Sequence, residues 1–381
     1  MKVLFISSWY PTPVNPNYGI FVKEHAKAIK TTTTDLRVLA IVVQQADVFL
    51  KTSHREYIDE SGIRTFEIII QTKMRDLIYH LIPLQSRIAY WYFKKTINPY
   101  FSPDIIHSNV IFPAGMIGDF FSRKLKKPHI ITEHWSKIEG LLKKPYLSFL
   151  GKRSYKKANM ILPVSLFLKL KMLDLLPELK QNKLKVIPNV ISSEVFDYKE
   201  KAGKTDEIRF CAVASWVTKR QPDKKPELFI EALAEIQKKT TKKIKLTMVG
   251  DGNRVNELKI LCKSLNLDAD FVGYQTKNQI AVILQQNNYF VHASTIETFG
   301  VVIVEALMTG TPVICSNVGA LPELITEANG VLCENNVAAW MKGLEKIIQS
   351  EFDRKRIAED VKNRFSYDSI GKEIALIYET L

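Results

Sequence analysis

The chain has 381 residues, more than one hydrophobic core usually sustains, so its length predicts two domains. Its composition, 46% hydrophobic and 25% charged, is that of an ordinary globular protein and excludes a disordered chain. The net charge of +14 lies entirely in residues 1–190, where 29 Lys+Arg face 14 Asp+Glu, which either favours an anionic partner (nucleic acid or an acidic membrane) or only keeps the protein soluble.

Short apolar strands alternate with helices along the chain. Strands are predicted at 2–7, 36–43, 104–110, 129–134 and 159–165, with a helix at 19–30. The pattern then restarts, with strands at 208–215, 243–250, 269–274, 288–294 and 311–316 and helices at 226–240, 253–265, 278–286 and 300–310. Because the strands are continuous apolar runs, we expect them to be buried on both faces in parallel sheets.

Two successive sets of such units predict an α/β protein of two doubly wound, Rossmann-like domains. The boundary is expected in the Lys/Glu/Ser-rich stretch near residue 190, which gives domains 1–190 and 191–365. Ligands in doubly wound sheets bind beyond the carboxyl ends of the strands, so the sequence predicts a site in a cleft that the two domains face.

No apolar run approaches the roughly 18 residues of a transmembrane helix. The opening "MKVLFISSWYP" is too short for the apolar core of a signal peptide. Four cysteines without metal-ligand spacing fit a reducing compartment. We therefore expect a cytoplasmic protein, or one peripheral on the inner face of a membrane.

The stretch "HASTIETFGVVIVEALMTGTPVICSNVGALPEL" places one acid before a predicted helix and another inside it. Glu297 lies in the loop after a strand, Glu305 lies within the helix, and Gly310 is expected to end that helix. The amino end of a helix suits a phosphate or diphosphate. A nucleotide sugar carries a hexose on one side of its diphosphate and a ribose on the other, so one acid could serve each.

The same stretch resembles the E-x7-E block of the retaining glycosyltransferases of family 4, which have the GT-B fold. Further blocks resemble that family in order: "SSWYPTPVNPNYGIFVKEHAKAI", "DIIHSNVIFPAGMIG", "HIITEHWS", "VIPNVI", "LTMVGDG" and "FVGY". The last segment, 366–381, looks like the family's final helix, which packs back on the N-terminal domain. The resemblance implies an acceptor-side N-terminal domain and a C-terminal domain that binds the nucleotide sugar.

The resemblance assigns the donor-binding residues one by one. It implies that Glu297 acts at the donor hexose and that Glu305 binds the ribose hydroxyls. Contact with the diphosphate is implied for Lys225 and for the backbone of Thr298, Phe299 and Gly300. The family's second cation falls in a gapped region that reads "ASWVTKRQPDKK", where Arg220 is the substitute and Lys219 the reserve.

The resemblance also assigns roles to residues that lie mainly in the N-terminal half. Gly19 matches a loop glycine that approaches the donor phosphate, and His134, at a strand end, matches a histidine that faces the reacting centre. His107 and Asn109 fall at a paired-histidine site whose second histidine is replaced, which weakens a proton relay there. Asn189 is expected near the hinge, and Tyr274 at the nucleotide base.

The resemblance implies transfer with retention from a UDP- or GDP-sugar, without an obligatory cofactor or metal. The resemblance also implies a front-face route in which the leaving phosphate oxygen takes the acceptor's proton. A double displacement as in glycosidases has little support, because no carboxylate pair at glycosidase spacing is identifiable. A D-x-D motif exists at Asp268–Asp270, but it precedes a strand rather than following one, so we expect no metal there.

The acceptor must meet the basic half of the chain. Basic residues mixed with aromatic ones in 72–95, 121–127 and 143–157 fit adsorption to an anionic bilayer. We therefore predict a sugar or lipid-linked acceptor, as in cell-surface polysaccharide assembly, although the same segments could be ordinary helices packed in the N-terminal domain.

Three alternative functions differ in how well the sequence fits them. A dinucleotide-dependent oxidoreductase would need a G-x-G-x-x-G turn after the first strand, which is missing. A nucleic-acid-binding protein without enzymatic activity could use the basic half, and a nucleotide-sugar 2-epimerase would share the two-domain fold.

Overall fold

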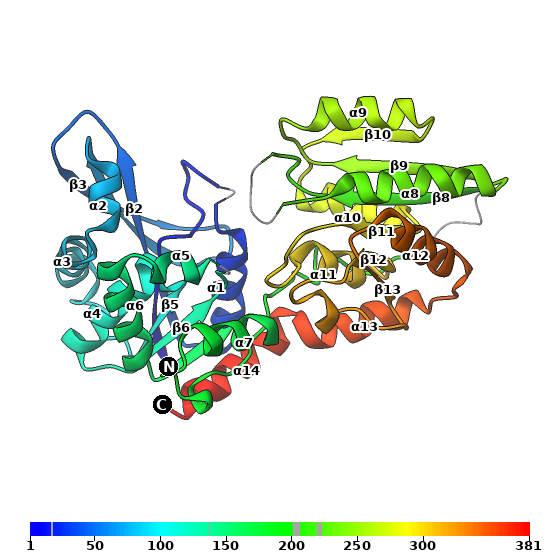
Figure 1. The fold of residues 1–381 in the computed structure, drawn as a ribbon. Helices are drawn as coiled ribbons and strands as arrows, with labels where there is room; N and C mark the ends of the chain where they lie inside the picture. The colour runs from blue at the N-terminus through cyan, green and yellow to red at the C-terminus, as the bar shows by residue number, and fades with distance from the viewer. Residues whose placement is uncertain (17, 136, 201–205, 219–222) are drawn as a thin grey trace. The chain divides into compact units, whose positions relative to one another are not determined.

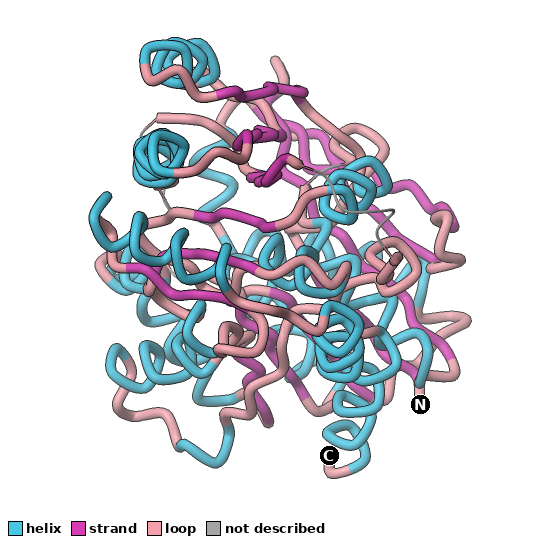
Figure 2. Tube along the Cα trace, turned by 90° about the vertical axis from the view of Figure 1, so that its right-hand side faces the viewer, coloured by secondary structure: helices cyan, strands magenta, loops and turns pink. Residues whose placement is uncertain are grey.

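The computed structural model describes residues 1–16, 18–135, 137–200, 206–218 and 223–381. The chain divides into two compact units, an N-terminal unit of Met1–Val190 with Tyr367–Leu381, and a C-terminal unit of Ile191–Ser366. In each unit strands and helices alternate along the chain, and helices flank the sheet (Figures 1 and 2). The predicted α/β fold class is therefore confirmed.

The N-terminal unit contains a seven-stranded sheet with the order β3-β4-β2-β1-β5-β6-β7. All neighbouring strands are parallel except β3 and β4, which pair antiparallel. The strands are β1 (Lys2–Ser7), β2 (Asp35–Gln45), β3 (Lys51–Ile58), β4 (Arg64–Thr72), β5 (Ile105–Asn109), β6 (His129–Glu133) and β7 (Met160–Pro163).

Helices connect these strands and cover the sheet. They are α1 (Ile20–Thr32), α2 (Arg75–His80), α3 (Ile82–Tyr92), α4 (Met116–Leu125), α5 (Ile138–Leu142), α6 (Pro145–Lys157), α7 (Leu166–Leu175) and α14 (Tyr367–Glu379). The last helix lies beside α1, where a Cβ on Gly371 would come within 2.5 Å of the Ala28 carbonyl oxygen (Figure 1). Segment Tyr367–Leu381 thus belongs to the N-terminal unit.

The C-terminal unit contains a six-stranded, all-parallel sheet with the order β10-β9-β8-β11-β12-β13. Its strands are β8 (Glu207–Val213), β9 (Lys243–Val249), β10 (Asp268–Gly273), β11 (Tyr289–His292), β12 (Val313–Ser316) and β13 (Gly330–Cys333). Its helices are α8 (Pro226–Lys239), α9 (Val255–Ser264), α10 (Lys277–Gln286), α11 (Val301–Met308), α12 (Val337–Gln349) and α13 (Arg354–Phe365).

The basic and aromatic segment 72–95 forms α2 and α3. Ile78, Ile82 and Ala89 are buried, as expected for helices that pack in the unit, but Leu77 and Trp91 are 59% and 55% exposed. Within the described part of the chain, no helix is long and apolar enough to cross a membrane.

Candidate functional site

The C-terminal sheet changes its winding direction between β8 and β11. From β8 the chain winds toward β10, and from β11 it winds toward β13, so these two adjacent strands form the topological switch point. Beyond their carboxyl ends, the Lys225 N–H donates to the Ala293 carbonyl at 3.1 Å and the Thr295 N–H to the Asp223 carbonyl at 3.0 Å. These bonds fix two loops at the place where doubly wound sheets bind ligands.

Glu297 is the centre of a charged cluster at this switch point. Its Oε1 accepts a hydrogen bond from Lys224 Nζ and lies 2.8 Å from His292 Nε2. His292 is the last residue of β11 and is buried, whereas the Lys224 and Glu297 side chains keep 20% and 12% of their surface exposed. The cluster is therefore largely enclosed, with part of the two charged side chains in contact with solvent.

The cluster keeps Glu297 ionised. Burial would raise the pKa of its carboxyl, but the His292 hydrogen bond and the Lys224 charge outweigh it and lower that pKa to about 2. Burial and the nearby Lys224 lower the pKa of His292, so we assign a neutral imidazole whose Nε2–H donates to Glu297. Glu297 is thus a pure acceptor, suited to hydroxyl donors.

Helix α11 starts directly after this loop. Its first amide groups have no acceptor within the helix, which makes its amino end a site for negative charge. Gly319, from the loop after β12, backs the site: its φ is +58°, and a Cβ there would lie 2.1 Å from the Glu297 carbonyl oxygen. Only glycine lets the two loops approach so closely.

The predicted donor residues around α11 differ in their surroundings. Thr298 is partly exposed, whereas Gly300 is buried and immediately precedes the helix. The Phe299 side chain is buried, and its ring centroid lies 5.7 Å from that of Phe365. This packing anchors the loop. Glu305 lies inside α11 and is only 7% exposed.

Lys224 contacts Glu297, whereas its neighbour Lys225 is the lysine predicted to contact the diphosphate. Lys225 points its ammonium group to Asp223, at 2.9 Å, and its side chain is 43% exposed. Arg254 supports the Lys224 backbone, because its Nη1 donates to the Lys224 carbonyl at 3.3 Å. The predicted second cation, Arg220, and its reserve, Lys219, lie outside the described residues.

Tyr274 follows β10 at the same edge of the sheet. Its side chain is 61% exposed, and its backbone N–H donates to Asp251 Oδ2 at 3.0 Å. The D-x-D carboxylates lie within β10 itself, not in the loop before it: Asp268 pairs with Lys243 at 2.7 Å and Asp270 with Lys245 at 2.8 Å.

In the N-terminal unit, Gly19 ends the loop between β1 and α1. Its φ is +73°, and a Cβ would lie 2.1 Å from the Trp9 carbonyl oxygen, so the loop folds tightly against the segment after β1. The start of α1 therefore lies close to the carboxyl end of β1.

His134 follows β6 and is held by a polar cluster. Its Nε2 lies 3.1 Å from Asn109 Oδ1, at the end of β5, and its ring is 5.0 Å from that of His25. Asn189 belongs to this cluster through its Oδ1, 3.3 Å from His25 Nε2. Burial lowers the pKa of both imidazoles, that of His25 to about 4, so both are neutral near pH 7. If His134 Nε2–H donates to Asn109, Nδ1 remains an acceptor.

Glu133 fixes the backbone at His134. Its carboxylate is fully buried and accepts from the N–H groups of His134 at 3.0 Å and Trp135 at 2.8 Å, and from the Tyr155 hydroxyl at 2.7 Å. His107, by contrast, uses both ring nitrogens on protein groups: Nδ1 lies 2.6 Å from the Tyr378 hydroxyl, and Nε2 2.7 Å from Thr132 Oγ1.

Sequence reasoning missed Lys224, His292 and Gly319. His292 could have been found, because it lies near the carboxyl end of the predicted strand 288–294, five residues before Glu297. Lys224 adjoins the predicted lysine, and only the backbone pairing with Ser294 decides which of the two side chains points to the acid. The sequence around Gly319 shows only a glycine in a predicted loop and does not indicate its close approach to Glu297.

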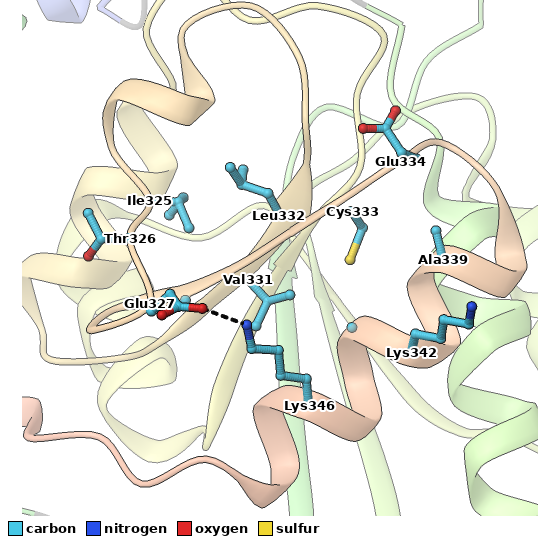
Figure 3. Close-up of a pocket in the computed structure, with 12 residues that line it drawn as sticks. Ile325, Thr326, Glu327, Val331, Leu332, Cys333, Glu334, Ala339, Lys342 and Lys346 are labelled. Carbon is cyan, nitrogen blue, oxygen red and sulfur yellow. Dashed lines mark hydrogen bonds and ion pairs between the residues drawn. The ribbon is translucent and has the colours of Figure 1, made fainter.

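A cavity of about 530 Å³ lies elsewhere in the C-terminal unit, over the edge strand β13 and against α12 (Figure 3). Lys346 and Glu327 form an ion pair of 3.0 Å at its border. Burial raises the pKa of Cys333, which lines the cavity, to about 12, so its thiol stays protonated near pH 7. The Glu297 cluster does not line this cavity.

Two family descriptions match separate parts of the chain. "Glycosyl transferases group 1" matches residues 199–364, and "Glycosyltransferase Family 4" matches residues 46–195. The chain is 27% identical to an uncharacterized glycosyltransferase from Methanocaldococcus jannaschii over 84% of this chain and 90% of that protein. It is also 27% identical to the alpha-monoglucosyldiacylglycerol synthase of Streptococcus pneumoniae, over 77% of this chain and 70% of that protein.

Solved structures share the fold. Anabaena HepE in complex with UDP superposes with a TM-score of 0.73 at 17% identity, and the alignment covers 100% of both chains. The sucrose-phosphate synthase of Thermosynechococcus elongatus gives a TM-score of 0.70 at 17% identity, with 100% of this chain and 99% of that chain covered.

Proposed function

The chain belongs to the glycosyltransferases of family 4, with the GT-B fold, and from this premise we propose that it transfers a hexosyl group from a nucleotide diphosphate sugar with retention. The observation that carries the proposal is the Glu297–His292–Lys224 cluster at the switch point, directly before α11. It combines an ionised acceptor, a cation and a helix start.

The donor is proposed to lie along this cluster. Glu297 would accept hydrogen bonds from hexose hydroxyls, while the backbone at Thr298, Phe299 and Gly300 would meet the diphosphate. Lys224 has three N–H donors and uses one on Glu297, so it can hold a phosphate oxygen as well. Glu305 would bind the ribose and Tyr274 the base. A UDP- or GDP-sugar is the expected donor, and Anabaena HepE, which shares the fold, was solved with UDP and with UDP-glucose.

The proposed reaction breaks the bond between the anomeric carbon and the diphosphate oxygen and forms a bond to the acceptor oxygen on the same face. The acceptor's proton passes to the leaving phosphate oxygen. Lys224 would stabilise the charge that develops on that phosphate, a contribution that commonly amounts to several kcal/mol. No protein nucleophile is required, and Glu297, tied to a cation and a histidine, acts as a binding group.

His134 is proposed as the catalytic residue of the N-terminal unit. As a neutral imidazole with Nδ1 as acceptor, it would hold a hydroxyl of the reacting sugar. Asn109, Asn189 and Glu133 would position it, and Gly19 would let the start of α1 approach the donor phosphate.

The acceptor is proposed to be a sugar or a lipid-linked sugar, as in polysaccharide assembly at the inner face of a membrane. Exposed aromatic residues of the basic N-terminal unit support an anionic surface as partner, among them Trp91 at 55% and Phe149 at 66% exposure. The relative from Streptococcus pneumoniae is named as a synthase of a glycolipid.

A thermal-shift panel of UDP-, GDP- and ADP-sugars on the full chain tests the proposal. One class of nucleotide sugar is expected to raise the unfolding temperature by about 3 °C or more at saturating concentration. Glu305→Ala should abolish that shift, because the ribose hydroxyls lose their acceptor. NMR of the product should then show the anomeric configuration of the donor.

Glu327→Ala is the matched control, because Glu327 lies in the same unit and forms a solvent-exposed ion pair with Lys346. This variant should respond like the wild type. The proposal fails if no nucleotide sugar shifts the transition, if Glu305→Ala responds fully, or if the donor is only isomerised without transfer.

A further inference from the structure

A second cavity, of about 240 Å³, lies in the N-terminal unit at the carboxyl ends of β1 and β2. Its lining includes Ser8, Thr12, Tyr18, Val43, Arg75 and Tyr79. This volume is slightly below the usual range for drug-sized ligands, roughly 300–1,000 Å³, and suits a single sugar ring with one substituent. It is independent of the Glu297 cluster, which belongs to the other unit.

Arg75 gives this cavity a cation that is available to a ligand. Its side chain is 47% exposed, and its ion pair with Asp76, at 3.4 Å, leaves that carboxylate 93% exposed. Such surface pairs contribute little, about 0–1 kcal/mol, so a ligand anion can displace Asp76. The planar guanidinium matches the two oxygens of a phosphate or carboxylate.

A buried hydroxyl group also lines the cavity. Ser8 Oγ is shielded from water, and among the described residues it has no hydrogen-bond partner, which is costly unless a ligand or water supplies one. The acids nearest to the Tyr10 wall, Asp59 and Glu60, both pair with Lys23, at 3.4 and 2.6 Å, so this one lysine offsets one of their two negative charges.

Aromatic rings connect this cavity to His134. Tyr18 packs against Trp9, with ring centroids 6.2 Å apart, and Trp9 packs against Phe21 at 6.4 Å. Phe21 in turn lies 4.8 Å from the His134 ring. Aromatic faces carry negative potential and attract the weakly positive C–H groups of a sugar ring.

We propose that this cavity binds an anionic group, a phosphate or carboxylate, on the acceptor, and that Arg75 selects for that charge. The inference rests on the proposed transferase function, since it names the chemistry of the acceptor. Three independent features support it: an available guanidinium, a buried hydroxyl without a partner in the described part of the chain, and aromatic walls that lead to the candidate catalytic histidine. The basic character of residues 1–190 adds a long-range attraction for the same ligands.

Binding of soluble probes to the full chain tests the soluble form of such an acceptor. Glucose 1-phosphate and glucuronate should bind in saturation-transfer NMR, and methyl glucoside should bind more weakly. Arg75→Ala should weaken the binding of the anionic probes about tenfold, because a charge-assisted hydrogen bond is lost. Arg87→Ala, which removes an exposed arginine of α3 outside the cavity, should change nothing.

Vesicles test the lipid-linked form. Phosphatidylcholine vesicles that carry a polyprenyl phosphate should co-sediment the wild type and Arg87→Ala, but much less of Arg75→Ala, if the anion belongs to a lipid. Arg75-dependent binding of either probe class supports the proposal and identifies the source of the anion. Absence of both, or equal binding by Arg75→Ala, overturns it.

Donor binding separates this test from the proposed function. Arg75→Ala should keep the thermal shift with the nucleotide sugar, because that ligand is assigned to the other unit. If the variant no longer binds the anionic probes but keeps the thermal shift with the nucleotide sugar, the defect lies in the acceptor cavity. If the wild type shows no donor shift, the proposed function fails while the cavity proposal is still decided by the probes.

Discussion

Lys224 and Lys225 are adjacent but differ in exposure and in the acid with which each one pairs. Lys224 Nζ reaches Glu297 and lies 3.2 Å from His292 Nε2, while Lys225 is half exposed and pairs with Asp223. Neighbouring residues in an extended segment point to opposite sides, so only one of the two can face the acid. The sequence predicts a cation before α8, but which of the two neighbouring lysines faces Glu297 is set by the pairing of Lys224 with Ser294 and not by the residue type.

Substituting the two lysines separately tests this assignment. Lys224→Ala is expected to lower the transfer rate by about 100-fold or more, as for loss of one group that stabilises transition-state charge. Lys225→Ala should stay within about threefold of the wild type, because it removes only an exposed ion pair. Steady-state transfer assays measure both rates, and circular dichroism checks that each variant is folded.

The reverse order of effects, or equal effects, would remove Lys224 from the site. If the transfer rate of Lys224→Ala falls by less than expected, KM and kcat should be compared separately. A rise in KM without a change in kcat would mean that Lys224 binds the donor equally well in the ground state and the transition state.

Among the elements, the α11 block was the most predictable part of the chain. The strand, the loop with Glu297, the helix and the glycine at its end follow each other within 22 residues, from Tyr289 to Gly310, and each has a local signal. Gly310 indeed has a left-handed conformation, with φ of +74°, just after the helix. The buried environment of Glu305 has no comparable local signal, because it depends on packing around the whole helix.

The β3–β4 hairpin was the main element that the sequence analysis missed. Strand β3 lies at the edge of the sheet, and its side chains alternate between exposed and partly buried, unlike the continuous apolar strands of a parallel sheet. The turn is made by Asp59, whose Oδ1 accepts from the Ser61 N–H at 2.9 Å, and by Gly62, at φ of +68°. The "DESG" sequence between two strand-like runs was the available signal.

For the whole molecule, buried histidines predict a loss of stability in mild acid. Burial lowers the pKa of four histidines of the N-terminal unit, to about 4 for His25 and about 3 for His129, with His107 and His134 shifted in the same direction. The unfolded chain takes up these protons as the pH falls below the ordinary value of 6.5, while the folded chain does not. The free energy of unfolding should therefore decrease as the pH falls from about 6.5 toward 4.

Each such group contributes a slope of at most about 1.4 kcal/mol per pH unit. Glu133, whose pKa burial raises, offsets part of this slope, because the folded chain takes up its proton first. Urea unfolding between pH 7 and 4.5 measures the slope. His129→Asn should reduce it by about one proton, and an unchanged slope in that variant would contradict the account.

Hydrogen exchange of the full chain with and without the nucleotide diphosphate chosen by the thermal-shift panel tests the central claim most directly. Binding at the switch point of the C-terminal sheet should slow amide exchange in peptides that span 223–226 and 294–305, because these backbone groups and the start of α11 contact the ligand. Slowed exchange confined to residues 1–190, or no slowing at saturating nucleotide, would contradict the assignment of the donor to the Glu297 cluster.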